Sequence, residues 1–426
     1  MTTLLPLLGC ADLESIMLWS EGQPVTRAEF LTRAIALADT LPAAGFLVNL
    51  CQDRYNFCTA FAAACLRGQT NLLPASVASG ALESVRNAYP NHVVVSDDAV
   101  RSLQVSGRSA MSVPGIRADH CAAIAFTSGS TGQPQAHAST WSTLIASGRR
   151  SAARIFKTSK LNLVATVPAQ HMFGLEMTIL QPLVNDCAVD SSKPFFPADV
   201  VAALARAPSP RALITTPAHL RACIAVHVDP MPGLEFVLSA TAPLARELAQ
   251  SVETNWKTRV LEIFGSTETG AIASRRTIEG DEWQVLPGGT LEMQEDSVRY
   301  RPDGATSSIA LHDRFELHGT DRFVLAGRSN DLIKVAGKRA SLADLNAKLM
   351  AISGVADGVV FQPEPDGRVA ALVVAIGMTE REILAALMRD LDEVFVPRPL
   401  RLVQTLPRDA VGKLARDRLL TALKSD

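Results

Sequence analysis

The stretch from residue 121 to residue 135 constrains the fold of this chain more than any other. Residues 121–126 are all apolar, which predicts a buried strand, and the next six residues are only Thr, Ser and Gly. Glycine lets a backbone approach an anion closely, while Ser and Thr add hydroxyl donors without bulk. The stretch therefore predicts a strand that leads into a phosphate-binding loop, with a plain surface turn as the alternative.

Two familiar phosphate-binding patterns do not occur at this loop. A nucleoside-triphosphatase loop needs Gly-Lys followed by Ser or Thr, and neither Gly-Lys pair of the chain is followed by either residue. The Rossmann pattern G-x-G-x-x-G is also absent, because the two glycines of the loop, Gly129 and Gly132, are three residues apart. If the loop binds phosphate, it does so in a different fold.

Length, charge and cysteine usage limit the class of protein. The chain has 426 residues, enough for two or three domains, and its net charge of −2 gives no support for nucleic-acid or anionic-membrane binding. It lacks a run of about 18 apolar residues, which a membrane helix needs. The spacing of Cys51, Cys58 and Cys65 predicts buried thiols on one face of a helix, with a metal or disulfide role as the alternative. We expect a reduced, cytoplasmic protein with no nucleic-acid or membrane partner.

Apolar runs alternate with helical patterns in the first part of the chain. Strands are predicted at residues 46–51, 92–96, 163–168, 212–217, 236–243 and 259–264, and helices at 26–38, 56–67 and 137–156. The first helix opens with a capping box at Thr26 and Glu29. Strand–helix alternation predicts an α/β fold with parallel pairing, in which ligands bind at the carboxyl ends of the strands.

The predicted pattern of strands and helices changes twice in the second part of the chain. Residues 288–328 alternate short strands with turns, and the residues after them form a compact α+β pattern, with Ser341 and Thr379 capping helices. The predicted fold is therefore α/β, with a large N-terminal domain, residues 1–328, of layered α/β subdomains and a small β-rich subdomain. A small mobile α+β domain, residues 329–426, follows it.

Four motifs occur in one order and together resemble those of a known family. Residues 127–135 resemble the phosphate loop of the adenylate-forming superfamily, which includes acyl-CoA synthetases, adenylation domains of peptide synthetases and luciferases. Residues 264–268 look like its aromatic-Gly-x-Thr-Glu motif. Asp313 with residues 327–337 is similar to its ribose and hinge segment, and residues 406–413 resemble its C-terminal lysine motif.

The resemblance implies a two-step reaction. Such an enzyme joins a carboxylic acid to the α-phosphate of ATP, releases pyrophosphate, and passes the acyl group to a thiol. ATP and Mg²⁺ are the implied cofactors, and the acceptor is coenzyme A or phosphopantetheine on an acyl carrier protein. Both steps depend on positioning and charge stabilisation.

The resemblance also assigns binding residues. The implied cofactor-binding residues are Thr127, Ser128, Gly129, Ser130, Thr131, Gly132, Thr241, Ala242, Pro243, Phe264, Gly265, Ser266, Asp313, Arg328 and Gly337. The first six belong to the phosphate loop, where the Thr and Ser residues would hold the β- and γ-phosphates. Phe264 would stack on adenine opposite residues 241–243. Asp313 would accept the ribose hydroxyls with help from Arg328, and Gly337 would lie beside the pantetheine.

Four residues carry the catalytic predictions that the resemblance implies. Lys413 would bridge the carboxylate and the α-phosphate in the first step; a solvated lysine in a basic tail is the alternative. Glu268 would bind Mg²⁺, which prefers carboxylate oxygen, and Thr267 would contact the α-phosphate. His171 would gate the acid pocket, with a histidine at the edge of the core as the alternative.

Two positions depart from the family pattern. Gln135 stands where the phosphate loop usually ends in Lys, and Asn330 stands where the hinge usually has Asp or Lys. We expect the loss of one cation to weaken ATP binding without abolishing the chemistry. These departures motivate the alternative of a non-catalytic nucleotide or acyl-adenylate binder, and a non-thiol acceptor is a further alternative.

The short chain is similar to compact stand-alone ligases of aryl-polyene and xanthomonadin pathways. That similarity implies an aromatic (hydroxybenzoate-like) or short acid and a carrier protein as possible partner. A basic run could form a docking face for an acidic carrier, or simply a solvated helix. The run consists of Arg149, Arg150, Arg154, Lys157 and Lys160.

Overall fold

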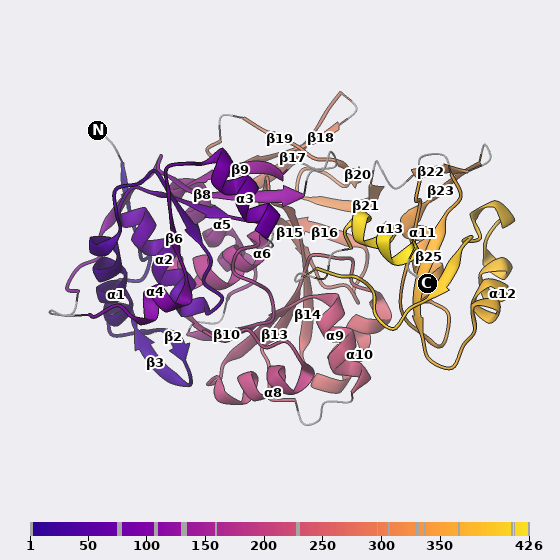
Figure 1. The fold of residues 1–426 in the computed structure, drawn as a ribbon, viewed down its shortest axis with the longest axis horizontal. Helices are drawn as coiled ribbons and strands as arrows, with labels where there is room; N and C mark the ends of the chain where they lie inside the picture. The colour runs from indigo at the N-terminus through magenta and orange to yellow at the C-terminus, as the bar shows by residue number, and fades with distance from the viewer. Residues whose placement is uncertain are drawn as a thin grey trace. The chain divides into compact units, whose positions relative to one another are not determined.

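The computed structural model confirms the predicted α/β class (Figure 1). It describes residues 3–74, 79–105, 110–128, 134–157, 160–226, 231–295, 297–305, 307–328, 332–335, 338–364, 367–409, 412 and 414–424. Contacts divide the chain into two units, Met1–Thr290 with Arg301–Ile309 and Leu291–Tyr300 with Ala310–Asp426. This division falls before residue 328, and the predicted boundary of the mobile domain stays a prediction.

The first sheet of unit 1 carries the strand of the Thr/Ser/Gly stretch. Its order is β6 (His92–Val95), β4 (Phe46–Asn49), β5 (Thr70–Leu73), β8 (Cys121–Ser128) and β9 (Pro134–Thr140). The pairs β4–β6, β4–β5 and β5–β8 are parallel, whereas β8 and β9 are antiparallel. Helix α1 (Arg27–Thr40) precedes β4, and α2 (Arg54–Leu66), α3 (Ser79–Ala88) and α4 (Asp97–Arg101) lie between successive strands of this sheet. The capping box predicted at Thr26 and Glu29 opens α1.

The second sheet of unit 1 is parallel at its centre. From one edge it runs β3 (Gln23–Thr26), β2 (Ile16–Ser20), β11 (Cys187–Asp190), β10 (Leu161–Ala165), β12 (Arg211–Thr215), β13 (Phe236–Ser239), β14 (Arg259–Ser266), β15 (Gly270–Arg275) and β16 (Glu282–Val285). The strands β2, β11, β10, β12, β13 and β14 pair in parallel, and β15 runs antiparallel to β14. Its helices are α5 (Trp141–Arg154), α6 (Met172–Gly174), the π-helical η1 (Leu175–Leu180), α7 (Gln181–Val184), α8 (Pro197–Arg206), α9 (Pro217–Ala225) and α10 (Arg246–Trp256).

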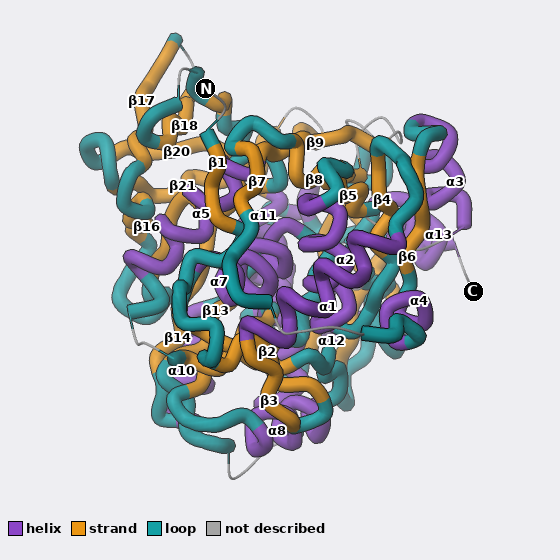
Figure 2. Tube along the Cα trace, turned by 90° about the vertical axis from the view of Figure 1, so that its left-hand side faces the viewer, coloured by secondary structure: helices purple, strands orange, loops and turns teal. Residues whose placement is uncertain are grey.

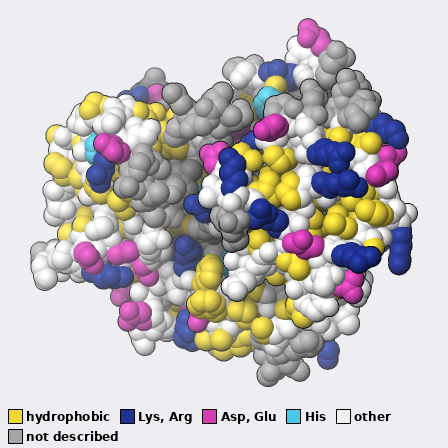
Figure 3. Space-filling view, turned by 45° about the vertical axis from the view of Figure 1, so that its right-hand side comes forward, with side chains coloured by type: hydrophobic (Ala, Val, Ile, Leu, Met, Phe, Trp, Pro, Cys, Tyr) yellow, Lys and Arg dark blue, Asp and Glu magenta, His cyan; other side chains and the backbone are white. Residues whose placement is uncertain are grey.

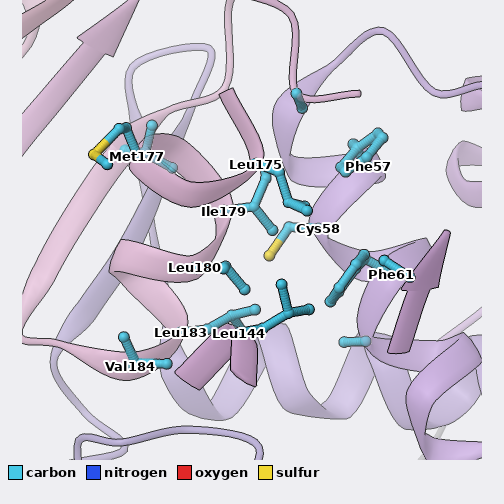
Figure 4. Close-up of a cluster of buried hydrophobic side chains, with 14 of the residues drawn as sticks. Phe57, Cys58, Phe61, Leu144, Leu175, Met177, Ile179, Leu180, Leu183 and Val184 are labelled. Carbon is cyan, nitrogen blue, oxygen red and sulfur yellow. The ribbon is translucent and has the colours of Figure 1, made fainter. Parts of the chain in front are cut away.

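Alternating side chains bury both faces of this sheet. Leu163 and Ala165 on β10 belong to the core between the two sheets, and Val164 belongs to the core that α8, α9 and α10 cover. Helices α1 and α2 lie side by side in the layer between the sheets (Figure 2). Phe57, Cys58 and Phe61 on α2 face Leu175, Ile179 and Leu183 there (Figure 4). Unit 1 is therefore a stack of helix and sheet layers.

One predicted helix begins later than expected. The helix predicted over residues 137–156 is preceded by strand β9, and α5 starts only at Trp141. The side chain of Thr140 caps α5 by accepting from the Thr143 N–H, so residues 134–140 are free to pair with β8. The prediction was wrong for residues 137–140, because the pairing of β9 with β8 is a tertiary contact.

Unit 2 contains the C-terminal segment. Strands β20 (Asp313–Leu317) and β21 (Arg322–Arg328) form a hairpin, as do β22 (Leu332–Val335) and β23 (Lys338–Ser341). A sheet of β24 (Val355–Phe361), β25 (Ala370–Ala375) and β26 (Leu400–Leu402) packs with α11 (Leu342–Met350), α12 (Glu380–Asp390), η3 (Glu393–Phe395) and α13 (Arg416–Lys424). The predicted caps at Ser341 and Thr379 are both present.

The remaining strands are short. β1 (Leu4–Pro6) pairs with β7 (Gly115–Arg117), and β17 (Gly289–Gln294), β18 (Ser297–Pro302) and β19 (Ile309–Ala310) form a small sheet. Lys and Arg side chains lie among acidic and apolar ones on the face shown in Figure 3. Among the described residues, no helix is long and apolar enough to cross a membrane. The cytoplasmic location stays a prediction.

The three evenly spaced cysteines are buried free thiols, as predicted. Cys58 and Cys65 lie on α2, whereas Cys51 precedes the helix, so the expectation of one shared helix face was wrong for Cys51. Burial raises the pKa of the Cys65 thiol to about 12. Such thiols are packing groups of the core.

Candidate active site

The candidate site lies where the two sheets of unit 1 present their loops. Strand β8 ends at Thr127 and Ser128, and the predicted phosphate-loop residues after it, Gly129, Ser130, Thr131 and Gly132, lie outside the described residues. In the β8–β9 register Thr127 pairs with Gln135 and Ala125 pairs with His137. Because cross-strand partners and alternate residues share a face, these four side chains lie on the same face of the sheet.

His137 joins two predicted site residues. Its Nε2 lies 3.1 Å from the Thr127 hydroxyl and 3.4 Å from Oε1 of Glu268. The His137 side chain is only 10% exposed, whereas the Glu268 carboxylate is 40% exposed and open to solvent. The end of β8 and the tip of the β14–β15 connection therefore meet at one imidazole. The sequence analysis assigned no role to His137.

The turn that presents Thr267 and Glu268 is braced from within. Ser266 and Thr269 exchange hydrogen bonds: the Ser266 N–H donates to the Thr269 hydroxyl at 3.1 Å, and the Thr269 N–H donates to the Ser266 hydroxyl at 3.3 Å. A side chain at Gly265 would collide with the backbone of Gly270, because its Cβ would lie 2.2 Å from the Gly270 carbonyl oxygen. The motif residues Gly265 and Ser266 thus shape the turn. Their nucleotide contacts stay predictions.

A buried carboxylate holds the far end of this turn. Glu176 on η1 is 2% exposed; its Oε2 accepts from the Ala271 N–H at 2.8 Å, and its Oε1 accepts from the Ser147 hydroxyl. Gly270 has φ +65° and its Cβ would lie 2.7 Å from Glu176, so a glycine is required there. Desolvation raises the pKa of Glu176, and the charge of Arg150 partly opposes it. Glu176 is a second residue that the sequence analysis missed.

The two predicted walls of the purine pocket lie at neighbouring strands. Ser239 on β13 pairs with Glu262 on β14. Residues 241–243 come just beyond the end of β13, and Phe264 lies within β14, two residues after Glu262. The Leu244 N–H donates to the Glu262 carboxylate at 3.0 Å, which ties the first wall to β14. The Phe264 ring lies 5.7 Å from that of Trp283.

Thr241 adopts φ +79°, which is rare for a β-branched residue and costs about 1–3 kcal/mol. Such strain persists only where the surrounding structure imposes it, and it concentrates at functional sites. Ala242 is half-buried and Pro243 exposed. This backbone is therefore held in a specific shape beside β14.

His171 lies in the connection that follows β10. It is half-buried and directly precedes α6, where its carbonyl accepts from the Leu175 N–H at 2.7 Å. Because β10 is parallel to β12 and β13, His171 follows the same edge of the sheet as residues 241–243. This placement is compatible with the predicted gate, which stays a prediction.

Unit 2 brings the two predicted ribose residues into register. Asp313 on β20 pairs with Arg328 on β21. Gly337, Asn330 and Lys413 lie outside the described residues. The neighbours of Lys413 are held in place: Arg408 makes two hydrogen bonds to Asp357, at 3.0 and 2.7 Å, and donates to the Gly412 carbonyl at 2.8 Å. Arg408 also bridges to Leu414 through the backbone.

The basic run after the phosphate loop does not form one exposed face. Arg149, Lys157 and Lys160 are exposed, but Arg150 and Arg154 are half-buried, and Arg154 donates to the Gln284 side chain. Arg154 contacts β16 through Gln284, and the charge of Arg150 lowers the pKa of Glu176 against the effect of its burial. A docking face for an acidic carrier protein stays a prediction.

Comparison with known proteins places this geometry in a family. A family model described as AMP-binding enzyme matches residues 46–292, which is more than half of the chain. The matched residues include β8, His171 and the turn with Glu268. The chain belongs to the AMP-binding enzyme family, and the predictions of the adenylate-forming superfamily and of an enzyme are confirmed.

The relatives that this chain resembles are ligases. The 4-coumarate–CoA ligase of Halorhodospira halophila is 28% identical over 305 residues, which cover 69% of this chain and 75% of the relative. The sulfoacetate–CoA ligase of Cupriavidus necator is 25% identical over 367 residues, covering 76% and 71%. The structure of O-succinylbenzoate coenzyme A synthetase from Bacillus subtilis with ATP and magnesium matches with a TM-score of 0.80 and 18% identity, over 96% of this chain and 97% of that one. The last similarity supports the fold alone.

The donor set at Glu268 is suited to Mg²⁺. Among the described residues no group of three or more His, Cys, Asp or Glu side chains could hold a metal ion. Mg²⁺ usually keeps several waters and is bound by one or two carboxylates together with substrate phosphates. One solvent-accessible carboxylate beside the strand that leads into the phosphate loop fits that mode of binding.

Proposed function

We propose that this protein is an ATP-dependent acid–thiol ligase. It would form an acyl- or aryl-adenylate with release of pyrophosphate, and then transfer the acyl group to a phosphopantetheine thiol. The observation that carries the proposal is that Nε2 of His137 lies near both the Thr127 hydroxyl and the Glu268 carboxylate, in a member of the AMP-binding enzyme family. The motifs imply phosphate binding for the first of these groups and Mg²⁺ binding for the second.

In the first step a carboxylate oxygen attacks the α-phosphorus of ATP, and the bond to the β-phosphate oxygen breaks. Thr127 and Ser128, with Ser130 and Thr131, would hold the β- and γ-phosphates, and Thr267 would contact the α-phosphate. Mg²⁺ bound with ATP offsets the charge of the phosphates, and Glu268 would hold it. Lys413 would neutralise the repulsion between the two anionic reactants.

In the second step the thiol sulfur attacks the acyl carbon, and AMP leaves with the electrons of the broken C–O bond. Phe264 and residues 241–243 would keep the adenine in place, and Asp313 with Arg328 would hold the ribose. Gly337 would lie beside the pantetheine arm, and His171 would gate the acid pocket. These roles rest on the family membership and on the motif positions.

The relatives suggest the acid and the acceptor. Their names specify 4-coumarate, an aromatic acid, and sulfoacetate, a short one, and both are coenzyme A ligases. We therefore propose an aromatic or short acid, with coenzyme A as the first acceptor to test. A phosphopantetheinylated acyl carrier protein is the second acceptor, as in the ligases of aryl-polyene and xanthomonadin pathways.

The test is ATP–pyrophosphate exchange with hydroxybenzoates, 4-coumarate, sulfoacetate and a long-chain acid. We expect exchange with at least one aromatic or short acid, followed by thioester formation when an acceptor is added. The Lys413→Ala variant should lose about 100-fold or more of the exchange rate and still bind ATP, because the lysine acts on the charge of the reacting groups. ATP binding without exchange for any acid would favour a non-catalytic binder, and exchange without thioester formation would favour a non-thiol acceptor.

A further inference from the structure

His137 lies between two groups that the proposed reaction needs. It is two residues beyond Gln135 on β9 and on the same face, so it lies next to the position where the family usually has Lys. Its imidazole is 10% exposed, which restricts its rotamers, and a single nitrogen contacts both Thr127 and Glu268. These two partners come from distant parts of the chain, because Thr127 lies on β8 and Glu268 lies in the turn between β14 and β15.

The chemistry of the partners favours one direction for these contacts. The direction of the Thr127–His137 hydrogen bond depends on the tautomer of the imidazole, because Nε2 can donate to the hydroxyl or accept from it. The carboxylate of Glu268, 3.4 Å away, only accepts when ionised, which favours the hydrogen on Nε2. In that tautomer the imidazole donates to the Thr127 oxygen, and the hydroxyl hydrogen of Thr127 is available to a phosphate oxygen. The same N–H would orient the carboxylate of Glu268 toward the metal.

We propose that His137 is a positioning residue for Mg·ATP, which rests on the proposed function for the roles of Thr127 and Glu268. It orients the Thr127 hydroxyl as a donor and holds the Glu268 carboxylate. This arrangement keeps the Thr127 hydroxyl and the Glu268 carboxylate in defined positions beside the triphosphate, on the sheet face where Gln135 replaces the usual Lys. Partners of this kind, one step removed from the metal, typically change metal affinity by about 10–100-fold when they are removed.

The test compares three variants in calorimetric titrations with ATP, with Mg²⁺ or with EDTA and without any acid. His137→Leu removes both contacts, and His137→Gln restores an N–H at a similar reach from the backbone. His318→Leu is the matched control, because His318 lies 3.7 Å from the Glu316 carboxylate in an exposed pair to which no role in the site is assigned. Thermal unfolding of each variant reports whether it is folded.

We expect His137→Leu to lower the affinity for Mg·ATP by about tenfold or more and to change the affinity for metal-free ATP much less. His137→Gln should recover most of the loss, and His318→Leu should bind as the wild type does. Equal affinity of wild type and His137→Leu for Mg·ATP would overturn the proposal. So would equal losses with Mg²⁺ and with EDTA, or a His137→Gln variant as weak as His137→Leu, since both outcomes indicate a merely structural residue.

The binding experiment is independent of turnover. A wild-type protein that binds Mg·ATP but exchanges no pyrophosphate with any acid overturns the proposed function. The ratio of the Mg·ATP affinities of wild type and His137→Leu still tests the role of His137 in that case. A wild-type protein that binds no Mg·ATP overturns both proposals.

Discussion

Glu176 shows how one buried side chain can shape a loop that faces solvent. Its carboxylate receives the Ala271 N–H and the Ser147 hydroxyl directly behind the turn with Thr267 and Glu268. Desolvation disfavours the charged form of a buried carboxylate even when it accepts two hydrogen bonds. We therefore infer that the backbone held by Glu176 is important. The Glu176 carboxylate holds the turn in a defined shape, and its burial lowers the stability of the protein near neutral pH.

Replacing Glu176 with Gln should make the protein's stability less dependent on pH. Burial raises the pKa of Glu176 in the folded protein above its ordinary value of 4.5. Its stabilising contribution is therefore fully present below 4.5 and is lost as the pH rises through the folded-state pKa. The free energy of unfolding of wild type minus that of Glu176→Gln should decrease as the pH increases from about 4 to 8.

Denaturant unfolding of both proteins across this pH range measures the difference, in which the contributions of all other titrating groups cancel. Gln can donate to the Ser147 oxygen and accept from the Ala271 N–H, so the turn is kept. A difference that stays constant with pH, or one that increases, would contradict the assignment of a raised pKa to Glu176.

Arg408 ties described residues beside Lys413 to the body of unit 2. The guanidinium of Arg408 makes a bidentate ion pair with Asp357 on β24. The side chains of Arg408 and Asp357 are 20% and 23% exposed. The same group donates to the Gly412 carbonyl, next to Lys413. Bidentate Arg–carboxylate pairs impose geometry as well as affinity, so Gly412 is tied through Arg408 to a strand far away in the sequence.

We predict that Arg408→Leu slows ATP–pyrophosphate exchange by about 10–100-fold, because small misplacements of a catalytic group have effects of that size. Transfer from a supplied acyl-adenylate to the thiol should change much less, since Lys413 is assigned to the first step. The control is Lys348→Met, which breaks an exposed pair with Asp344 at 3.1 Å on α11. Equal losses in both half-reactions would show that Arg408 does not act through Lys413.

For the protein as a whole, we expect ligand binding to increase the free energy of unfolding. A ligand that binds only the folded state stabilises it by about 2.7 kcal/mol at a concentration 100 times its Kd. The residues assigned to the triphosphate and to adenine belong to a unit with one large core between two sheets. We therefore expect this unit to respond to nucleotide as one body.

We predict that Mg·ATP at saturating concentration raises the Tm by several degrees, on the order of 2–4 °C for each kcal/mol in a domain of about 200 residues. Scanning calorimetry with ATP and Mg²⁺, ATP with EDTA, and Mg²⁺ alone measures the effect. The shift should be largest with both ATP and Mg²⁺. An unchanged Tm under all three conditions would contradict nucleotide binding by the folded chain.

Much of the local structure could be predicted because its causes are local. The capping boxes at Thr26 and Thr379 need only residues three apart, and both helices begin where these boxes indicate. The alternation of apolar runs predicted the parallel strands β10, β12 and β13 for the same reason. The predicted start of α5 was wrong, because residues 134–140 pair with β8 and the local helical preference does not outweigh that hairpin.

The candidate site shows the same division. Order and residue type of the motifs predicted the family, and the alternation of strands and helices predicted the α/β fold. The binding of Mg²⁺ by Glu268 stays a prediction. His137 and Glu176 carried no signal in the sequence: each looks like a common polar residue until its partners are known. Only the tertiary structure brings Thr127, His137 and Glu268 together. The pairing of β8 with β9 sets the distance from Thr127 to His137, and the packing of the two sheets over a shared core brings Glu268 to them.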